Sequence, residues 1–162
     1  MAVDCFIKIG DIKGESTDKS HKDEIDVLAW SWGMSQSGTM HISKGGGAGK
    51  VNIQDLSITK WVDSATPNLM AACSSGKHFP EATLVVRKAG GDSPLEYLKI
   101  KLSEVLISSV STGGSGGEDR LTENVSLNFG KVEVSYQPQD EKGAKKGGEI
   151  KYGWDIQQNV KA

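Results

Sequence analysis

The first group of residues that could carry chemistry is the glycine-rich run before Lys50. Residues 45–50 read GGGAGK, a spacing that invites comparison with a phosphate-binding loop. Such a loop needs glycine at the position that Lys44 occupies and a Mg²⁺-binding hydroxyl at the position that Val51 occupies. Neither is present, and no strand–loop–helix pattern surrounds the run. A flexible loop is the better interpretation.

Histidines and acidic residues form the second group of candidates. The chain has three histidines, in separate segments: His21, His41 and His78. None has a second histidine or a carboxylate at the spacing of metal ligands on a helix, so we expect surface or hydrogen-bonded histidines. Glu118 and Asp119 lack the further oxygen ligands of a calcium loop, and turn formation or pairing with Arg120 explains them better.

No serine lies in the G-x-S-x-G turn that exposes a nucleophile in hydrolases. Together with the two groups above, this leaves no recognisable catalytic residues. We therefore expect a protein that is not an enzyme and that has no cofactor and no metal site.

The segment 29–37, AWSWGMSQS, is the most informative one. One side of an extended strand would carry Trp30, Trp32 and Met34, an apolar row suited to a core. The other side would carry only small, uncharged residues: Ala29, Ser31, Gly33, Ser35 and Ser37. Exposed strand faces normally carry Lys, Glu or Thr. This bare face indicates either close packing against a neighbouring element or a smooth surface that lines a cavity or contacts a partner.

Apolar residues at every second position indicate that β-strands form most of the chain. We expect about eight strands, more than one flat sheet usually holds without curling or splitting. Their ranges are Val3–Ile9, Asp23–Gln36, Met40–Ser43, Val51–Trp61, Ala82–Lys88, Glu96–Ser109, Glu123–Tyr136 and Ile150–Val160.

One segment, 66–76, has the pattern of a short helix. Thr66 can cap its N-terminus, Pro67 suits the first turn, and Gly76 suits the left-handed residue just past its end. The helix is expected to cover the end of the barrel with one face, made of Leu69, Met70 and Cys73.

In three of the expected strands the apolar side changes partway along. The changes fall at Gln54-Asp55, Ser103-Glu104 and Gly130-Lys131. An inserted residue turns every later side chain to the other face, as happens where strands turn a corner or close a barrel. The alternative is that both faces are buried there. The pattern predicts an all-β fold with one short α-helix, an antiparallel β-barrel or sandwich.

Composition limits the possible partners. The chain has 162 residues, which suits one domain over residues 1–162, with 21 acidic and 19 basic side chains. The formal charge of −2 predicts no nucleic-acid partner. The first residues do not resemble a signal peptide, and no stretch is apolar enough for a membrane span. Cys5 and Cys73 are expected to be free thiols in a chain that folds in a reducing cytoplasm.

Four stretches closely resemble the haemolysin-coregulated protein (Hcp) family of bacterial type VI secretion systems. They are AWSWGMSQSG (29–38), TPNLMAACSSGKHFPEATLVVRKAGG (66–91), EVLISSVSTGGSGGEDRLTENVSLNF (104–129) and KYGWDIQQN (151–159). The resemblance implies a β-barrel of two sheets that assembles into a homohexameric ring. Such rings stack into a tube inside a contractile sheath, a trimeric spike protein caps the tube, and the lumen carries or chaperones small effector proteins. The protein would be secreted without a cleavable signal peptide.

The resemblance also suggests where contacts lie. The bare face becomes a candidate lumen wall, with Ser31, Gly33 and Ser35 as effector contacts. Candidate ring-stacking contacts are Ser43, Lys44 and Gly45 in one loop, Gly90 and Gly91 at a hairpin tip, and Gln157. The alternative function is a secreted β-sandwich that binds a ligand such as a carbohydrate, with tryptophans as stacking platforms: Trp30, Trp32, Trp61 and Trp154.

Overall fold

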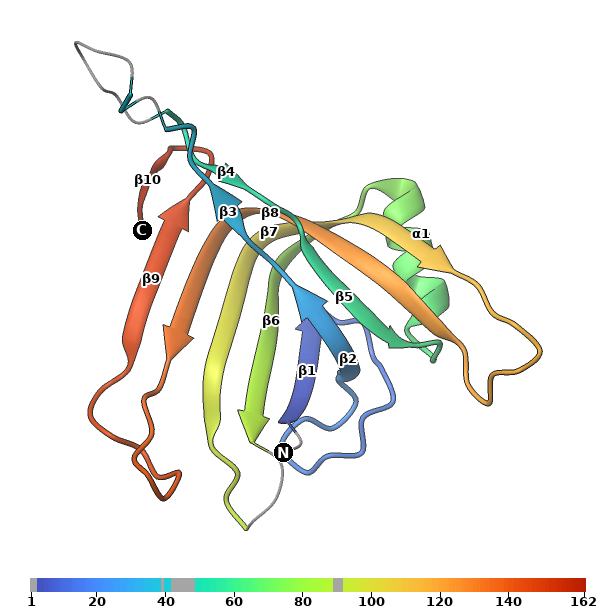
Figure 1. The fold of residues 1–162 in the computed structure, drawn as a ribbon. Coiled ribbons are helices and arrows are strands. Elements are labelled where there is room, and N and C mark those ends of the chain that lie inside the picture. The colour runs from blue at the N-terminus through green and yellow to red at the C-terminus, as the bar shows by residue number, and fades with distance from the viewer. Residues whose placement is uncertain (1–2, 39, 42–48, 89–91) are drawn as a thin grey trace.

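The computed structural model describes residues 3–38, 40–41, 49–88 and 92–162. It contains one helix and a series of strands (Figure 1). In chain order these are β1 (Val3–Ile9), β2 (Ile25–Ser31), β3 (Met34–Ser35), β4 (Asn52–Ile53), β5 (Leu56–Trp61), α1 (Thr66–Ser75), β6 (His78–Lys88), β7 (Glu96–Thr112), β8 (Thr122–Tyr136), β9 (Ile150–Asp155) and β10 (Val160–Lys161).

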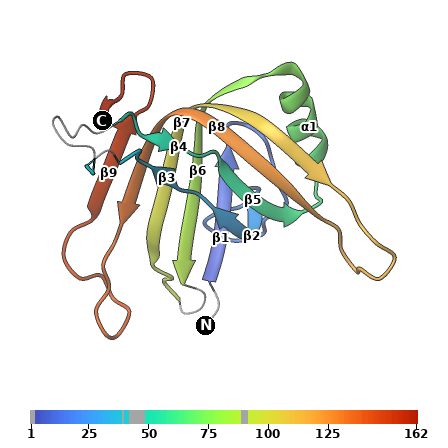
Figure 2. The same ribbon diagram turned by 45° about the horizontal axis from the view of Figure 1, so that its top comes forward.

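Six of the strands close into an antiparallel barrel. Their order is β8-β5-β2-β1-β6-β7, and β7 pairs with β8 to complete the circle. β9 and β10 extend the sheet from β8, while β3 and β4 form a separate two-stranded arm that leaves the barrel from the ends of β2 and β5 (Figures 1 and 2). The expected fold, an antiparallel barrel with one short helix, is confirmed.

The long strands β7 and β8 belong to two sheets at once. Residues 122–127 of β8 pair with β5, whereas residues 131–136 pair with β9. The buried side chains change parity between these halves, from Leu127 and Phe129 to Val132. In β7 the change lies between Leu102 and Val105. Both changes fall where the apolar pattern predicts them.

An aligned bend, and not an inserted residue, produces these changes of face. Pairing between β7 and β8 keeps its register across the bend, as does pairing between β6 and β7, so that Pro80, Glu104 and Gly130 lie side by side. Glu104 has a φ of +55°, which turns the chain within the strand. A Cβ atom on Gly130 would lie 2.7 Å from the Glu104 carboxylate, so the glycine leaves the space that this carboxylate occupies opposite the bend.

The arm explains the corner at Gln54-Asp55. Two expected strands are divided where they pass from the barrel into the arm: Asp23–Gln36 contains β2 and β3, and Val51–Trp61 contains β4 and β5. The expected strand Ile150–Val160 is divided by a turn into β9 and the first residue of β10. The expected strand Met40–Ser43 is wrong for its described part, since Met40 and His41 form a turn.

Helix α1 follows the expected bounds but not the expected contacts. Gly76 ends it with a φ of +67°, and its N–H donates to the Ala72 carbonyl. Thr66 does not cap the helix, because Ala65 holds the N-cap position and makes no side-chain hydrogen bond there. The buried face consists of Thr66, Leu69 and Ala72, whereas Met70 is exposed.

Thr66 joins a buried ion pair inside the barrel instead. The Lys60 Nζ lies 2.5 Å from the Glu123 Oε1, and both side chains are fully buried. The Thr66 hydroxyl donates to the same Glu123 oxygen at 2.5 Å, and Lys60 also lies 2.9 Å from the Asp63 Oδ1. This network ties the first turn of α1 to β5 and β8, because its members come from all three elements.

Breaking this pair from one side should destabilise the barrel strongly. Glu123→Leu leaves the Lys60 charge without its closest partner in the core, so we expect a loss of about 3–5 kcal/mol in the free energy of unfolding. The double variant Lys60→Met with Glu123→Leu should lose less, because neither charge of the fully buried pair remains and Asp63 keeps its hydrogen bond from the Ala65 N–H. Urea unfolding of the three proteins measures this. Equal losses in the single and double variants would contradict it.

Candidate functional site: a wall of hydroxyl and amide side chains

The outer face of the sheet β2-β5-β8-β7 carries two rows of small uncharged residues, all of them polar except Ala29. Strand register aligns one row as Ser31, Ser57, Ser126 and Ser109, and the other as Ala29, Thr59, Asn124 and Ser111. We call these eight positions the hydroxyl wall. They are exposed or half-buried, whereas the residues between them on β5 and β8 are buried in the barrel.

A register shift in each of the two edge strands, β2 and β7, turns the side chains that follow it toward the outer face of the sheet. β2 shifts between Val27 and Ala29, and β7 shifts between Ile107 and Ser109. A bulge of this kind moves the following side chains to the other face. Val27 and Ile107 therefore point into the core, and the serines that follow them point outward.

Hydrogen bonds across the strands stiffen the wall without adding charge. The Thr59 hydroxyl donates to the Asn124 side-chain oxygen at 2.7 Å, and the hydroxyls of Ser57 and Ser126 are 3.4 Å apart. The eight positions contain no ionisable side chain. Such a surface offers many weak donors and acceptors and no strong anchor, because a neutral hydrogen bond gains only about 1 kcal/mol net of water.

Charged groups lie at the two ends of the wall. At one end Asp55 accepts hydrogen bonds from the Ser108 hydroxyl at 2.7 Å and from the Asn128 amide at 2.8 Å. At the other end the Arg120 guanidinium lies 4.4 Å from the centre of the Trp61 ring. Asp55 also lines a pocket of about 700 Å³ beside the bend, which includes Glu104 and Gln157.

The predicted lumen residues fall in two places. Ser31 lies on the hydroxyl wall and is exposed. Gly33 lies in the link between β2 and β3, where its carbonyl accepts a hydrogen bond from the Gln54 N–H at 3.0 Å. Ser35 lies on the arm, paired with Asn52. The structure thus brings Ser31 together with residues from three other strands, but not with Gly33 or Ser35.

Most of the wall was not found from the sequence. The missed positions are Ser57, Thr59, Ser109, Ser111, Asn124 and Ser126. A signal exists in ENVSLN (123–128) and ISSVST (107–112), where Ser, Thr and Asn stand among the apolar residues and Lys is absent. That signal does not say which strands are neighbours.

The predicted stacking residues are described only in part. Ser43, Lys44, Gly45, Gly90 and Gly91 lie outside the described residues. Gln157 is exposed in the turn between β9 and β10. Its role in stacking stays a prediction.

The tryptophans do not form a platform for a sugar. Trp30 and Trp32 pack against the core, and the Trp32 indole N–H donates to the Gln54 carbonyl at 3.0 Å. Trp61 is covered by Arg120, and Trp154 is packed against the core. Met34, expected in the core row, is exposed instead on the arm.

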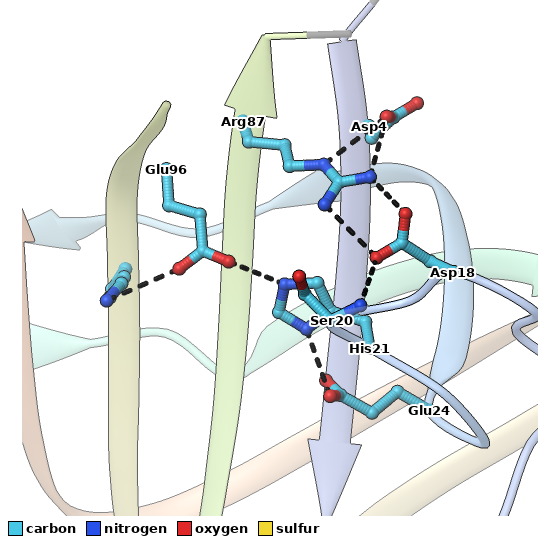
Figure 3. A network of polar contacts seen from close by, with 8 residues as sticks. Asp4, Asp18, Ser20, His21, Glu24, Arg87 and Glu96 are labelled. Carbon is cyan, nitrogen blue, oxygen red and sulfur yellow. Dashed lines mark hydrogen bonds and ion pairs between the residues drawn. The ribbon is translucent and has the colours of Figure 1, made fainter. Parts of the chain in front are cut away.

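A second polar cluster holds the segment between β1 and β2 onto the barrel (Figure 3). His21 lies 2.9 Å from the Glu24 carboxylate and 2.6 Å from the Glu96 carboxylate, and its ring stacks on Phe6. The Arg87 guanidinium donates to Asp4 and Asp18. His21 is therefore a hydrogen-bonded histidine, as expected.

Two pKa shifts follow from this cluster. The hydrogen bond from Arg87 lowers the pKa of Asp18. Burial by itself raises the pKa of Glu96, but hydrogen bonding and attraction from His21 outweigh burial and hold it below its ordinary value. Elsewhere, burial raises the pKa of the Cys5 thiol to about 12, which makes this free cysteine unreactive.

Within the described ranges, no group of three or more His, Cys, Asp or Glu side chains is arranged so that it could hold a metal ion. Likewise, no helix in the described part of the chain is long and apolar enough to cross a membrane. The fold and the wall define a class of small β-barrel proteins whose distinctive surface is a neutral polar sheet face.

Comparison with known proteins names the family. The profile described as "Type VI secretion system effector, Hcp" matches residues 6–136. The protein Hcp1 of Pseudomonas aeruginosa is 73% identical over the full length of both chains. The structure of Hcp1 from Salmonella typhimurium is 42% identical, with a TM-score of 0.83 over all of both chains. A structure titled as a type six secretion system protein gives a TM-score of 0.92 at 35% identity, covering 99% of this chain and all of the other. The chain belongs to the Hcp family of type VI secretion proteins.

The Glu96 shift has a measurable consequence for stability. Because the folded pKa is lowered, the carboxylate stabilises the fold above its ordinary pKa of 4.5, and this contribution is lost as pH falls through the folded value. We expect Glu96→Gln to reduce stability at pH 7 and to have a much smaller effect near pH 3. Urea unfolding across this range measures the difference. The exposed Glu81→Gln serves as the control, and an effect of Glu96→Gln that did not change with pH would contradict the prediction.

Proposed function

We propose that this chain is the tube subunit of a type VI secretion system. Copies join side by side into a closed homohexameric ring whose inner surface is the hydroxyl wall. The rings stack into a tube with a trimeric spike protein at its tip, and a contractile sheath drives the tube out of the cell. Small effector proteins travel in the lumen. Membership of the Hcp family supports the secretion role.

The observation that carries the assembly is that the wall ends at two unpaired strand edges. Residues 28–31 of β2 pair only with β5, because β1 meets β2 only at Ile25 and Asp26. At the far side, residues 107–112 of β7 pair only with β8, since pairing with β6 stops at Leu106. Both statements concern the described residues. An unpaired edge is a template for pairing with another chain.

The two edges differ, so pairing between copies would be head to tail. A head-to-tail contact generates a ring when the rotation between copies closes. Ser31 and Ser109 belong to the edge strands themselves. Joining β2 of one copy to β7 of the next would therefore continue the hydroxyl wall from copy to copy, and the closed ring would have a continuous inner surface of the same chemistry.

The chemistry of the wall suits a channel for transport. A protein cargo must be held weakly enough to be released. Neutral hydroxyl and amide groups can exchange hydrogen bonds with water for hydrogen bonds with cargo at little net gain in free energy. They attract neither positively nor negatively charged cargo strongly.

The ring is tested by mass in solution. We expect a single assembly with the mass of six chains that persists on dilution, because each copy has two interfaces and a closed ring has no free end. Mass photometry or native mass spectrometry measures it. A strict monomer at all concentrations would overturn the proposal.

The lumen assignment is tested by Ser31→Gln. We expect rings of normal mass and stability that no longer retain a small effector on co-purification, because six larger side chains narrow the channel. Ser135→Gln makes the same change on β8 outside the hydroxyl wall and should retain the effector. If Ser31→Gln rings carried every cargo as before, the lumen assignment would be lost.

A further inference from the structure

Helix α1 presents a face that is unusual for a helix in contact with water. Its ten residues, TPNLMAACSS, include no charged side chain. Its outward positions, spaced three or four apart, are Pro67, Met70, Ala71 and Ser74, and all are exposed. The Ser74 hydroxyl donates to the Met70 carbonyl at 2.8 Å, so it is already satisfied within the helix. Surface helices normally place charged residues on this side.

A second uncharged face lies where the sheet runs past the barrel. Val134 of β8 faces Tyr152 of β9, and Tyr136 faces Ile150. Val134 and Tyr136 have the parity of Val132, which is fully buried, so they continue the core side of the sheet beyond the strands that cover it. Ile150 is 64% exposed and Tyr136 is 45% exposed. We call Leu98, Val134, Tyr136, Ile150 and Tyr152 the extension face.

These two faces lie on opposite sides of the molecule. β9 and α1 are at opposite sides of the barrel in both ribbon views (Figures 1 and 2). One copy therefore cannot cover its own extension face with its own helix. Two different unpartnered faces on opposite sides are what a head-to-tail contact between copies requires.

The pairing of strand edges brings the two faces toward each other. α1 packs against β7, and both views show it beside the end of β7 that contains residues 107–112 (Figures 1 and 2). When that end meets β2 of the next copy, α1 travels with it. The free edge of β2 faces away from β5, toward the side on which the extension face stands (Figure 1).

We propose that helix α1 of each copy covers the extension face of its neighbour in the ring. This inference rests on the ring proposed above and names the second half of its interface. The small residues Ala71 and Ser74 allow the helix to approach the sheet closely, and Met70 fills the space against the aromatic rings. Neither face contains a charge that would have to lose its water.

A charge placed on either face tests the contact. Ala71→Lys and Ile150→Glu each change an exposed residue, so each chain should fold as before. Each should weaken every interface of the ring by roughly tenfold or more, equivalent to at least about 1.4 kcal/mol, because a charge is buried without a partner. The double variant Ala71→Lys with Ile150→Glu should recover much of the loss, since each interface then contains both charges.

Two matched controls separate contact from general charge effects. Ala144→Lys makes the same change in the loop between β8 and β9 and should leave the ring intact. Ala71→Lys with Ile150→Lys should be worse than either single variant. Dilution followed by mass photometry gives the concentration at which each ring dissociates, and circular dichroism checks the fold.

The outcomes distinguish this inference from the proposed function. If the unmodified chain forms a ring, yet Ala71→Lys and Ile150→Glu dissociate at the same concentration as Ala144→Lys, the helix contact is wrong and the ring stands. Loss in the single variants without recovery in the opposite-charge pair also overturns the direct contact. If the unmodified chain forms no ring, the proposed function itself fails.

Discussion

The rest of the structure depends on three neighbouring strands bending at the same register. Pro80, Glu104 and Gly130 lie side by side, so β6, β7 and β8 turn together and keep the same pairing register on both sides of the bend. A strand that bent alone would lose hydrogen bonds with both neighbours. Because the bend is shared, β7 and β8 can close the barrel with one half and carry β9 with the other. The two halves then expose opposite faces to water.

The bend has its own local requirements. Glu104 adopts a left-handed backbone conformation that non-glycine residues rarely take. Gly130 leaves room for its side chain, and the Gly130 carbonyl accepts a hydrogen bond from the Ile156 N–H at 2.9 Å. The turn after β9 is thereby held at the bend. A strained residue, a glycine and a backbone hydrogen bond from another segment together fix the corner between the sheets.

Charged side chains form two networks, one inside the barrel and one on its outside. The barrel interior contains the buried Lys60–Glu123 pair, which connects two strands with the first turn of α1. The segment between β1 and β2 is held onto the outside of the barrel by contacts of His21 with Glu96 and of Asp18 with Arg87 (Figure 3). The hydroxyl wall, on the outer face of β2, β5, β8 and β7, contains no ionisable side chain. Its neutrality does not weaken the fold, because ion pairs elsewhere fasten the elements that support it.

The amino-acid sequence alone determined most of the strands, the helix bounds, the positions of the corners and the bare face around Ser31. These are local properties, since a strand alternates its faces every two residues and Gly76 or Gly130 acts on its own surroundings. Only the tertiary structure decided that Ser31 lies beside Ser57, Ser126 and Ser109, that Thr66 serves a buried ion pair and that Met34 is exposed. Each of these depends on which distant strands become neighbours and in what register. That choice is set by packing of the whole barrel, which no short stretch of sequence contains.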